Sequence, residues 1–323
     1  MLFFKCLIAR ACMASAISIK GLNKWYAGGL HALKDVDLEI EKGDFFGYLG
    51  KNGAGKTTTI NCNTALSNFQ QGNIKVHGFD VVKEYREARK RIGLAQQDLL
   101  FDPALTVKQI VMYQAGYFGL SGRDVEDKTF ALLKEFKLEE KAGENFRKLS
   151  TGMKRKLQLV KALVHEPEVL ILDEPTATMD VETRHELWHK LRKLNRQGTT
   201  IVLTSHYIEE IERLCGKVGI IHEGKLIAFD GKKAFLSKLG NPTVRVLLQK
   251  PLEKLPAGLK ALDARLMEKN KAIAFTAKNA QEKLPSLLQA LKREKAQVKS
   301  VDIAQDKLED IYLRLTGEGN DEV

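Results

Sequence analysis

The chain has 323 residues, of which 44% are hydrophobic and 29% are charged, and its formal net charge is +11 at pH 7. This length suits one large domain and a smaller one. Basic residues outnumber acidic ones by 37 to 29 up to Gly240 and by 15 to 12 after it. The positive charge is therefore spread along the chain rather than gathered in a stripe, which argues against a nucleic-acid partner. The cysteines (Cys6, Cys12, Cys62 and Cys215) have no C-x-x-C spacing and indicate reduced thiols rather than a disulfide framework or a metal site.

The first 15 residues, MLFFKCLIARACMAS, are apolar but interrupted by Lys5 and Arg10. A signal peptide carries its positive charge before the apolar core, and this segment does not. We expect a disordered leader over residues 1–15, or an upstream start with Met13 as the working start; the alternative is a short surface-seeking segment. No stretch of the sequence approaches the roughly 18 apolar residues that a membrane span needs.

The pattern up to residue 96 predicts mostly strands. Alternating apolar and polar residues indicate half-buried strands, and FFGYLG is a short apolar strand that leads into a glycine loop and a helix. The predicted strands are 16–22, 32–40, 45–50, 73–78 and 91–96, and the helix is 56–66.

The middle of the chain predicts a helical insertion followed by strands that alternate with helices. Ser150 is the expected N-cap of a helix over 153–164, and Gly198 the expected C-cap of another. A hairpin should turn at Glu223–Gly224. The helices are 106–120, 124–138, 153–164 and 183–198; the strands are 168–175, 199–206 and the hairpin 217–231. Such alternation implies an α/β fold with a parallel sheet covered by helices on both faces.

After Gly240 the pattern changes and predicts a small separate α+β domain over residues 241–323. Strands are expected over 241–250, 272–277 and 297–304, and a helix over 282–294. Near the end, Leu308, Ile311, Tyr312 and Leu315 have the spacing of one apolar helix face.

The stretch GKNGAGKT, Gly50 to Thr57, fits the phosphate-loop pattern G-x-x-x-x-G-K-[ST] and lies between a predicted strand and a predicted helix. Glycines let the backbone curl so that successive N–H groups face phosphate oxygens. Lys56 would place a positive charge on the outer phosphates, and the Thr57 hydroxyl can bind Mg²⁺. The motif and its context predict a nucleoside triphosphate site.

A second acidic motif, VLILDE, would bring two carboxylates to the C-terminal edge of the sheet, where ligands bind in such folds. Asp173 would hold Mg²⁺ through water, and Glu174 would orient and deprotonate the attacking water. The alternative is a salt-bridged strand end without catalytic function.

From Ile17 to about Gly231 the sequence resembles the nucleotide-binding subunits of ATP-binding cassette (ABC) transporters. GKNGAGKTT matches the Walker A motif, QQD around Gln97 the Q-loop, LSTGM the signature, VLILDEP Walker B, ATMD the D-loop and TSH the switch histidine, all in family order. The tail, which closes in LEDIYLRLTG, is similar to that of exporter-type cassettes serving drug, polysaccharide or lipid efflux.

The resemblance implies a role for each matching residue. The cofactors would be ATP and Mg²⁺, with Glu174, His206 and Gln97 catalytic, and with Mg²⁺ held by Thr57, Gln97 and Asp173. Asp180 would stabilise a dimer across the site. The ATP-binding residues would be Tyr26, Gly50, Lys51, Asn52, Gly53, Ala54, Gly55, Lys56, Thr57 and Thr58. The signature residues, which would contact the ATP of a second subunit, are Ser150, Thr151, Gly152 and Met153. Trp25 neighbours Tyr26, and either aromatic could instead belong to a strand face.

The resemblance also implies the architecture and the partners. We expect a phosphate-loop NTPase core over 16–240 with a parallel sheet, an antiparallel β subdomain and a helical subdomain over about 98–165, plus the small α+β domain. The chain would be an ATPase that forms a homodimer around two ATP molecules. It would bind integral membrane transporter subunits through the helical subdomain, lie peripherally at the cytoplasmic face of the cell membrane and drive export.

Four positions depart from the common family pattern. Thr151 and Met153 replace a glycine and a glutamine of the usual LSGGQ, Thr178 replaces the D-loop glycine, and Lys51 stands where proline is common. Threonine is stiffer than glycine, so dimer closure or its rate could differ. Two alternatives remain open. One is a soluble cassette ATPase acting on ribosomes or DNA; the other is a simple phosphate-loop kinase, which would leave LSTGM and His206 unexplained.

Overall fold

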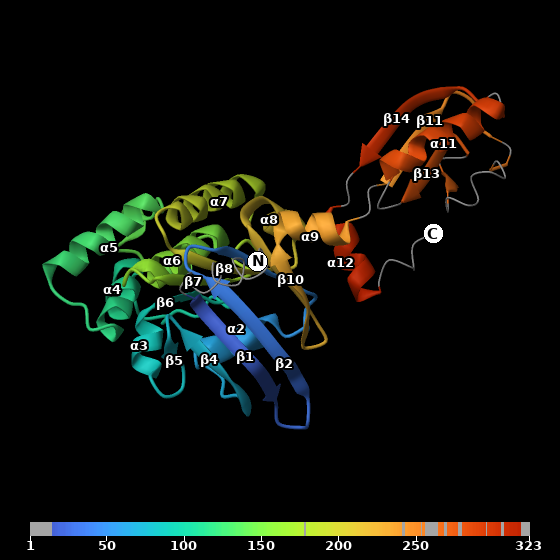
Figure 1. Cartoon of the computed structure of the whole chain (residues 1–323). Coiled ribbons are helices and arrows are strands. Elements are labelled where there is room, and N and C mark those ends of the chain that lie inside the picture. The colour runs from blue at the N-terminus through green and yellow to red at the C-terminus, as the bar shows by residue number, and fades with distance from the viewer. Residues whose placement is uncertain are drawn as a thin grey trace, which may run out of the picture. The chain divides into compact units, whose positions relative to one another are not determined.

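The computed structural model describes residues 15–177, 179–240, 243–252, 254–255, 264–267, 270–276, 280–294, 296–304 and 307–317. Except for Ser15, the predicted leader lies outside the described residues, and so does Thr178. Contacts within the chain divide it into two compact units, and the boundary falls between Lys232 and Lys233 (Figure 1). This boundary lies eight residues before the one that the sequence predicts at Gly240.

The first unit holds most of the helices and strands. In chain order they are β1 (Ser15–Trp25), β2 (His31–Glu41), β3 (Phe45–Leu49), α2 (Lys56–Asn63), β4 (Gln71–Val76), β5 (Phe79–Asp80), α3 (Tyr85–Lys90), β6 (Ile92–Ala95), α4 (Val107–Tyr117), α5 (Arg123–Glu135), the 3₁₀ turns η1 (Glu139–Lys141) and η2 (Phe146–Lys148), α6 (Thr151–Leu163), β7 (Val169–Asp173), α7 (Val181–Arg196), β8 (Thr200–Ser205), α8 (Ile208–Leu214), β9 (Lys217–His222) and β10 (Lys225–Gly231).

Two sheets form the frame of this unit. The described strands of the first are antiparallel, in the order β2-β1-β4-β5. The second has the order β10-β9-β3-β8-β7-β6, with parallel pairing from β9 to β6 and an antiparallel edge strand, β10. β3, β7 and β8 are buried along their whole length, as expected for strands covered on both faces.

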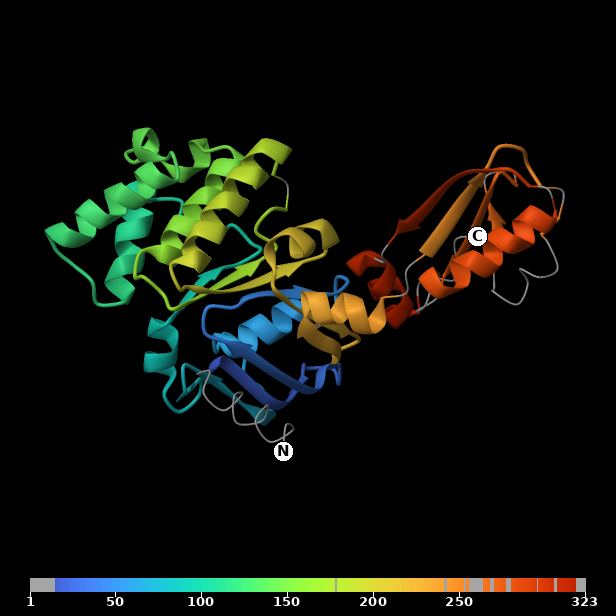
Figure 2. The same cartoon turned by 45° about the horizontal axis from the view of Figure 1, so that its top comes forward.

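Helix α2 lies between the two sheets and contacts β2, β4 and β7 (Figure 2). The core around it joins Ile60 of α2 to apolar residues of both sheets, including Ile17, Ile74, Ile171 and Val202. Helices α6, α7 and α8 contact strands of the six-stranded sheet, and α4 and α5 pack against α6. Gly93 of β6 permits close contact with α6, because an added Cβ would lie 2.3 Å from the carbonyl oxygen of Ala162. The six-stranded sheet, which carries the nucleotide-site candidates, is therefore packed against α2 and also against α6, α7 and α8.

The second unit begins with most of α9 (Lys232–Leu239). A four-stranded antiparallel sheet, in the order β12-β13-β11-β14, follows, and α11 contacts it. The elements are β11 (Thr243–Leu248), β12 (Arg265–Met267), β13 (Ala272–Thr276), α11 (Ala280–Arg293), β14 (Val298–Ala304) and α12 (Leu308–Thr316). Its core is separate from that of the first unit and includes Val244, Ile273, Phe275, Leu287 and Leu291.

The fold confirms the predicted α/β class, with its parallel sheet, antiparallel β subdomain and helical insertion. Ser150 caps α6 as predicted, and Glu223 and Gly224 turn the hairpin with φ of 46° and 80°. Gln197 is the C-cap of α7, and the predicted cap, Gly198, follows it with φ 104°. The predicted apolar face of α12 is buried up to Tyr312. Leu315, which follows it on the same face, is 37% exposed. Short elements such as α3, α8 and β12 were not predicted.

No helix among the described residues is both long enough and apolar enough to span a membrane.

Candidate active site

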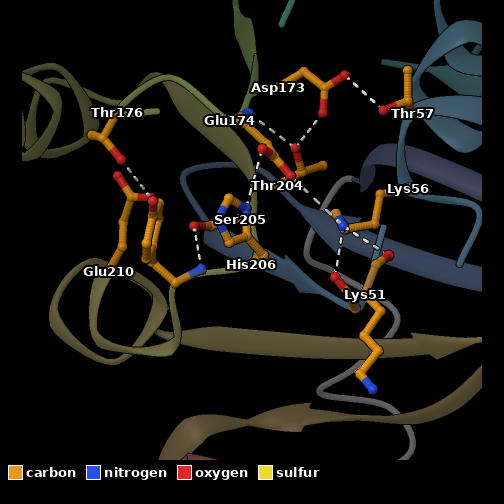
Figure 3. A network of polar contacts seen from close by, with 12 residues as sticks. Lys51, Lys56, Thr57, Asp173, Glu174, Thr176, Thr204, Ser205, His206 and Glu210 are labelled. Atoms are coloured by element: carbon orange, nitrogen blue, oxygen red, sulfur yellow. Dashed lines mark hydrogen bonds and ion pairs between the residues drawn. The ribbon is translucent and has the colours of Figure 1, made fainter. Parts of the chain in front are cut away.

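Three neighbouring strands bring the candidate residues to one edge of the six-stranded sheet. β3, β8 and β7 run parallel and side by side, so their carboxyl ends meet at the same edge. The phosphate loop follows β3, Asp173 and Glu174 close β7, and Thr204 to His206 close β8. Figure 3 shows their side chains pointing toward one another. The sheet thus joins segments that lie more than a hundred residues apart.

The phosphate loop wraps around the start of α2. Gly55 is the N-cap of α2 with φ 114°, a conformation that L side chains rarely adopt, and an added Cβ would lie 2.9 Å from Leu33 Cδ2. Lys56 is only 5% exposed, and its Nζ donates to the carbonyl oxygens of Gly50 at 2.6 Å and Lys51 at 3.1 Å. Burial lowers the pKa of Lys56, while the charges of Glu174 and Asp173 oppose that shift. The ammonium is therefore held at the mouth of the loop by neutral oxygens.

Asp173 connects the loop to the two central strands. Its Oδ2 accepts a hydrogen bond from Thr57 Oγ1 at 2.9 Å, and its Oδ1 accepts one from Thr204 Oγ1. The carboxylate is 2% exposed. Adjacent carboxylate and hydroxyl oxygens are the hard ligands that Mg²⁺ prefers. The chemistry of Thr57 and Asp173 therefore fits a magnesium ion.

Glu174 and His206 face each other across the ends of β7 and β8. His206 Nδ1 lies 3.1 Å from Glu174 Oε2, and Lys56 Nζ lies 3.8 Å from Glu174 Oε1. Glu174 has φ 48°, an unusual conformation for a residue with a side chain, and its N–H donates to the carbonyl and hydroxyl oxygens of Thr204. Its carboxylate is 7% exposed, whereas the side chain of His206 is 37% exposed. A buried carboxylate beside a reachable imidazole can take part in proton transfer.

Of the two candidate aromatics, Tyr26 is the one at the loop. Its hydroxyl lies 3.4 Å from Thr58 Oγ1, and its ring is 39% exposed. Trp25 instead stacks on His31, with ring centroids 4.1 Å apart. An exposed ring next to the phosphate loop suits the Tyr26 assignment better.

Gln97 follows β6, and its side chain is exposed. Its backbone is held by the signature helix α6, because Arg155 Nη1 donates to the carbonyl oxygens of Gln96 at 3.2 Å and Gln97 at 2.5 Å. Gln158 Nε2 donates to the carbonyl oxygen of Asp98 at 2.9 Å. The Q-loop and the signature helix are thus joined, although no described contact takes the Gln97 side chain to Asp173 or Glu174.

The signature residues lie at the N-terminus of α6. Ser150 Oγ accepts from the N–H of Met153 at 3.2 Å, and Ser150 and Thr151 are exposed. Gly152 and Met153 are half-buried. In the described part of the chain, the hydrogen bonds of these four residues do not reach the phosphate loop. The structure leaves this helix end facing outward, with free N–H groups of the kind that attract anions.

Asp180 has a structural role that the sequence did not reveal. It is the N-cap of α7, and its carboxylate accepts from the N–H and the hydroxyl of Thr183, both at 2.8 Å. The backbone hydrogen bond from Thr183 lowers the pKa of Asp180, assisted by the one from its hydroxyl. The carboxylate is therefore charged and exposed at the surface, as a contact to a second subunit would require.

Three further residues support the site and were missed by sequence reasoning. Thr204 bonds Asp173 and the backbone of Glu174, Arg155 holds the Q-loop, and Glu210 accepts from Thr176. Arg155 lies in the basic run MKRK, which reads as an ordinary exposed helix face. Its burial, with 7% of its surface exposed, was the missing signal.

Together these features define a phosphate-loop nucleotide hydrolase. The ABC transporter family model matches residues 33–177. The linearmycin resistance ATP-binding protein LnrL of Bacillus subtilis is 33% identical over 306 residues, which cover 93% of this chain and 98% of that protein. The Nod factor export ATP-binding protein I of Cupriavidus metallidurans is 35% identical over 308 residues, covering 94% and 98%.

Solved structures agree with these relatives. An ATP-binding subunit of an ABC transporter has a TM-score of 0.64 at 28% identity and covers 68% of this chain and 92% of its own. A dimeric ATP-binding cassette, in a post-hydrolysis state with ADP and Pi, has a TM-score of 0.62 at 25% identity and covers 67% and 98%. The chain belongs to the ABC transporter family. It is an ATP-binding subunit of such a transporter and an ATPase.

Proposed function

We propose that this chain powers export by closing as a homodimer around two Mg-ATP molecules, while separate membrane subunits carry the substrate. The convergence of Lys56, Thr57, Asp173, Glu174 and His206 at one sheet edge is the observation that carries the hydrolytic part. The direction is supported by the name of the Nod factor export relatives, which match most of this chain.

ATP would replace the present partners of Lys56. The ammonium turns from the carbonyl oxygens of Gly50 and Lys51 to the outer phosphates, while the loop N–H groups and the start of α2 surround the remaining oxygens. Thr57, Asp173 and Gln97 would hold the Mg²⁺, which would neutralise charge on the phosphates. The exposed ring of Tyr26 stacks on the adenine.

Glu174 serves as the general base and His206 contacts the terminal phosphate. The carboxylate lies between Lys56 and His206, so two cationic or hydrogen-bonding groups keep it at the site of attack. Buried behind the loop, it can accept a proton from water positioned in line with the terminal phosphate.

The outward-facing signature helix completes the site of a second copy. Ser150, Thr151, Gly152 and Met153 form the N-terminus of α6 and bring it to the terminal phosphate held by the partner subunit. Asp180 steadies the contact between the copies. Loss of that phosphate on hydrolysis removes the contact and reopens the dimer, as in other phosphate-ordered switches.

Membrane subunits dock beside α4. Three adjoining cavities of about 320, 610 and 260 Å³ all border Gln114, and Arg89 and Lys161 each border two of them. Arg86 and Lys90 add to the positive charge, whereas the acidic lining is Asp102. Burial lowers the pKa of Lys161, and no carboxylate of the described residues pairs with it. We therefore assign this groove to an acidic helix in a cytoplasmic loop of the membrane subunit, at the cytoplasmic face of the membrane.

Glu174→Gln tests this mechanism. The amide keeps the shape of the side chain but cannot accept a proton, so hydrolysis should fall by roughly 10² to 10⁴. Because Mg-ATP still binds, the closed state should accumulate, and a monomer on gel filtration should become a dimer with Mg-ATP.

Adding Ser150→Arg to that variant should abolish the dimer, because a bulky cation fills the space of the partner's terminal phosphate. Ser121→Arg, at another exposed serine, is the control and should leave the dimer intact. Hydrolysis by Glu174→Gln at the parent rate would overturn the base assignment. Co-purification of the chain from detergent with an integral membrane protein tests the transporter assignment, and recovery with ribosomes or DNA would contradict it.

A further inference from the structure

Glu210 is a buried carboxylate that neither the family motifs nor the proposed mechanism uses. It lies on α8, is 1% exposed, and accepts a hydrogen bond from Thr176 Oγ1 at 3.1 Å (Figure 3). It accepts another from Trp188 Nε1 at 3.0 Å. The side chain of Ser205 is close enough to oppose the rise of the pKa of Glu210. These three side chains come from different segments: the turn after β7, helix α7 and the end of β8. A buried charge is retained only where several donors satisfy it, and Glu210 meets that condition.

Two of these side chains stand next to the catalytic pair. Thr176 follows Glu174 by two residues, and Ser205 directly precedes His206. Glu210 lies on α8, which directly follows the His206 turn, and its hydrogen bond to Thr176 therefore joins that turn to the Glu174 turn, whose side chains meet at 3.1 Å. The turn that contains Thr176 also contains Glu174, whose unusual φ of 48° must be held by its surroundings.

Arg184 of α7 makes a second bridge between these turns, and its charge also stabilises the charged form of Glu210. Its guanidinium lies over the ring of Tyr207 at 5.2 Å, and its Nη2 donates to the carbonyl oxygen of Met179 at 3.5 Å. Met179 directly precedes Asp180. The two bridges thus run from the switch-histidine turn to the turn that leads from the catalytic base to the proposed dimer contact.

We propose that Glu210 is a positioning residue for ATP hydrolysis: it fixes the Glu174 turn against the His206 turn, so that the general base and the imidazole keep their geometry. The inference rests on the proposed roles of Glu174 and His206. It places Glu210 out of contact with nucleotide, so its loss acts on the rate and not on ATP affinity.

The test compares Glu210→Ala with Glu210→Gln. The glutamine keeps the links, because its amide oxygen accepts from Trp188 while its NH₂ donates to the hydroxyl oxygen of Thr176. Alanine leaves Trp188 and Thr176 without their acceptor and removes the link between the Glu174 turn and the His206 turn. We expect Glu210→Ala to lower kcat about 10- to 100-fold, the effect of a misplacement of about 1 Å, with the Kd for ATP unchanged. Glu210→Gln should restore most of the rate.

Asp80 supplies the matched control, because it is also a buried carboxylate with three donors, the side chain of Asn73 and the N–H groups of Val82 and Lys83. Asp80→Ala should lower the melting temperature while leaving the single-turnover rate of bound ATP at the parent value. If Glu210→Ala has the same effect as Asp80→Ala, Glu210 is structural only and the inference fails.

Thr176→Val removes one donor with little change of shape and serves if Glu210→Ala does not fold. It should lower kcat with unchanged ATP affinity, and combined with Glu210→Ala it should add little, because both changes cut one link. Parent affinity and kcat in Thr176→Val, or a Glu210→Gln variant as slow as Glu210→Ala, would overturn the proposal. Failure of the mechanism itself is seen separately, as hydrolysis by Glu174→Gln at the parent rate.

Discussion

At the scale of single residues, Lys56 is the group that would exchange its present partners for the phosphates of ATP. Its Nζ donates hydrogen bonds to two backbone carbonyl oxygens and lies 3.8 Å from Glu174 Oε1. Lys56→Ala should weaken ATP binding about 10- to 100-fold, the value of one or two charge-assisted hydrogen bonds. Calorimetric titration measures this loss, and Lys75→Ala, at an exposed lysine of β4, is the control. Equal affinities in the two variants would contradict the phosphate-loop assignment.

Glu210 also makes a prediction about pH. Burial raises its pKa, and the hydrogen bonds from Trp188, Ser205 and Thr176 oppose the shift. The folded state therefore holds this proton to a higher pH than the unfolded state, whose Glu pKa is about 4.3, so stability falls as pH rises from that value through the folded pKa. Glu210→Gln removes this loss, and its free energy of unfolding relative to the parent should rise as pH increases above about 4.3, measured in urea titrations.

Asp80 should behave in the opposite way. The N–H of Lys83 is the largest cause of its lowered pKa, with further hydrogen bonds from Val82 and Asn73. Its contribution to stability is complete above the unfolded pKa and is lost as pH falls through the folded one. The stability lost in Asp80→Asn relative to the parent should therefore become smaller as pH falls. The same pH trend in Glu210→Gln and Asp80→Asn would contradict one of the two assignments.

Sequence reasoning found the residues whose roles depend on local spacing. Lys56 and Thr57 follow from one short motif, and Asp173 and Glu174 from a buried strand with two acids at its end. Arg155 and Glu210 could not be found in this way, because their partners Gln97 and Thr176 lie 58 and 34 residues away. Only the fold brings such pairs together, and only burial distinguishes them from exposed charges.

At the scale of elements, long periodic segments were predictable and short ones were not. Helix α5 has 13 residues and a strong apolar face, whereas α8 has seven and β12 has three, too few to show a period. Such short elements depend on tertiary contacts: α8 packs against β3 and β8. The unpredicted α8 is nevertheless the element that carries Glu210.

The start of α4 gives a prediction at this scale. Thr106 and Gln109 form a capping box, in which Gln109 N–H donates to Thr106 Oγ1 at 3.3 Å and Thr106 N–H donates to Gln109 Oε1 at 2.9 Å. Thr106→Ala should destabilise the protein by about 1 kcal/mol, whereas Thr106→Ser keeps the acceptor and most of the stability. Chemical denaturation measures both. Equal losses in the two variants would show that the methyl group, not the cap, is responsible.

At the scale of the whole molecule, each compact unit has its own apolar core. The first core contains residues up to Ile221, and the second begins at Val244. Removing everything after Gly240 should therefore leave a folded cassette that binds ATP with the affinity of the full chain. A calorimetric titration of the truncated chain checks this, and an aggregated product would show that the second unit is needed for folding of the first.

The strand order of the six-stranded sheet also has a consequence for biosynthesis. All the described strands of the antiparallel sheet have been synthesised once Asp80 is added. In the six-stranded sheet, however, β3 pairs with β8, whose last residue comes 156 positions after the last residue of β3. At about 5 to 20 residues per second, a ribosome needs roughly 8 to 30 s to deliver that segment. The apolar core beneath the antiparallel sheet also lacks Val169 and Val202 for most of that time, and it lacks Ile221 until shortly afterwards. The nascent chain thus carries an uncovered apolar surface and an unfinished nucleotide pocket for roughly half of its translation, and chaperone binding should be concentrated in that interval.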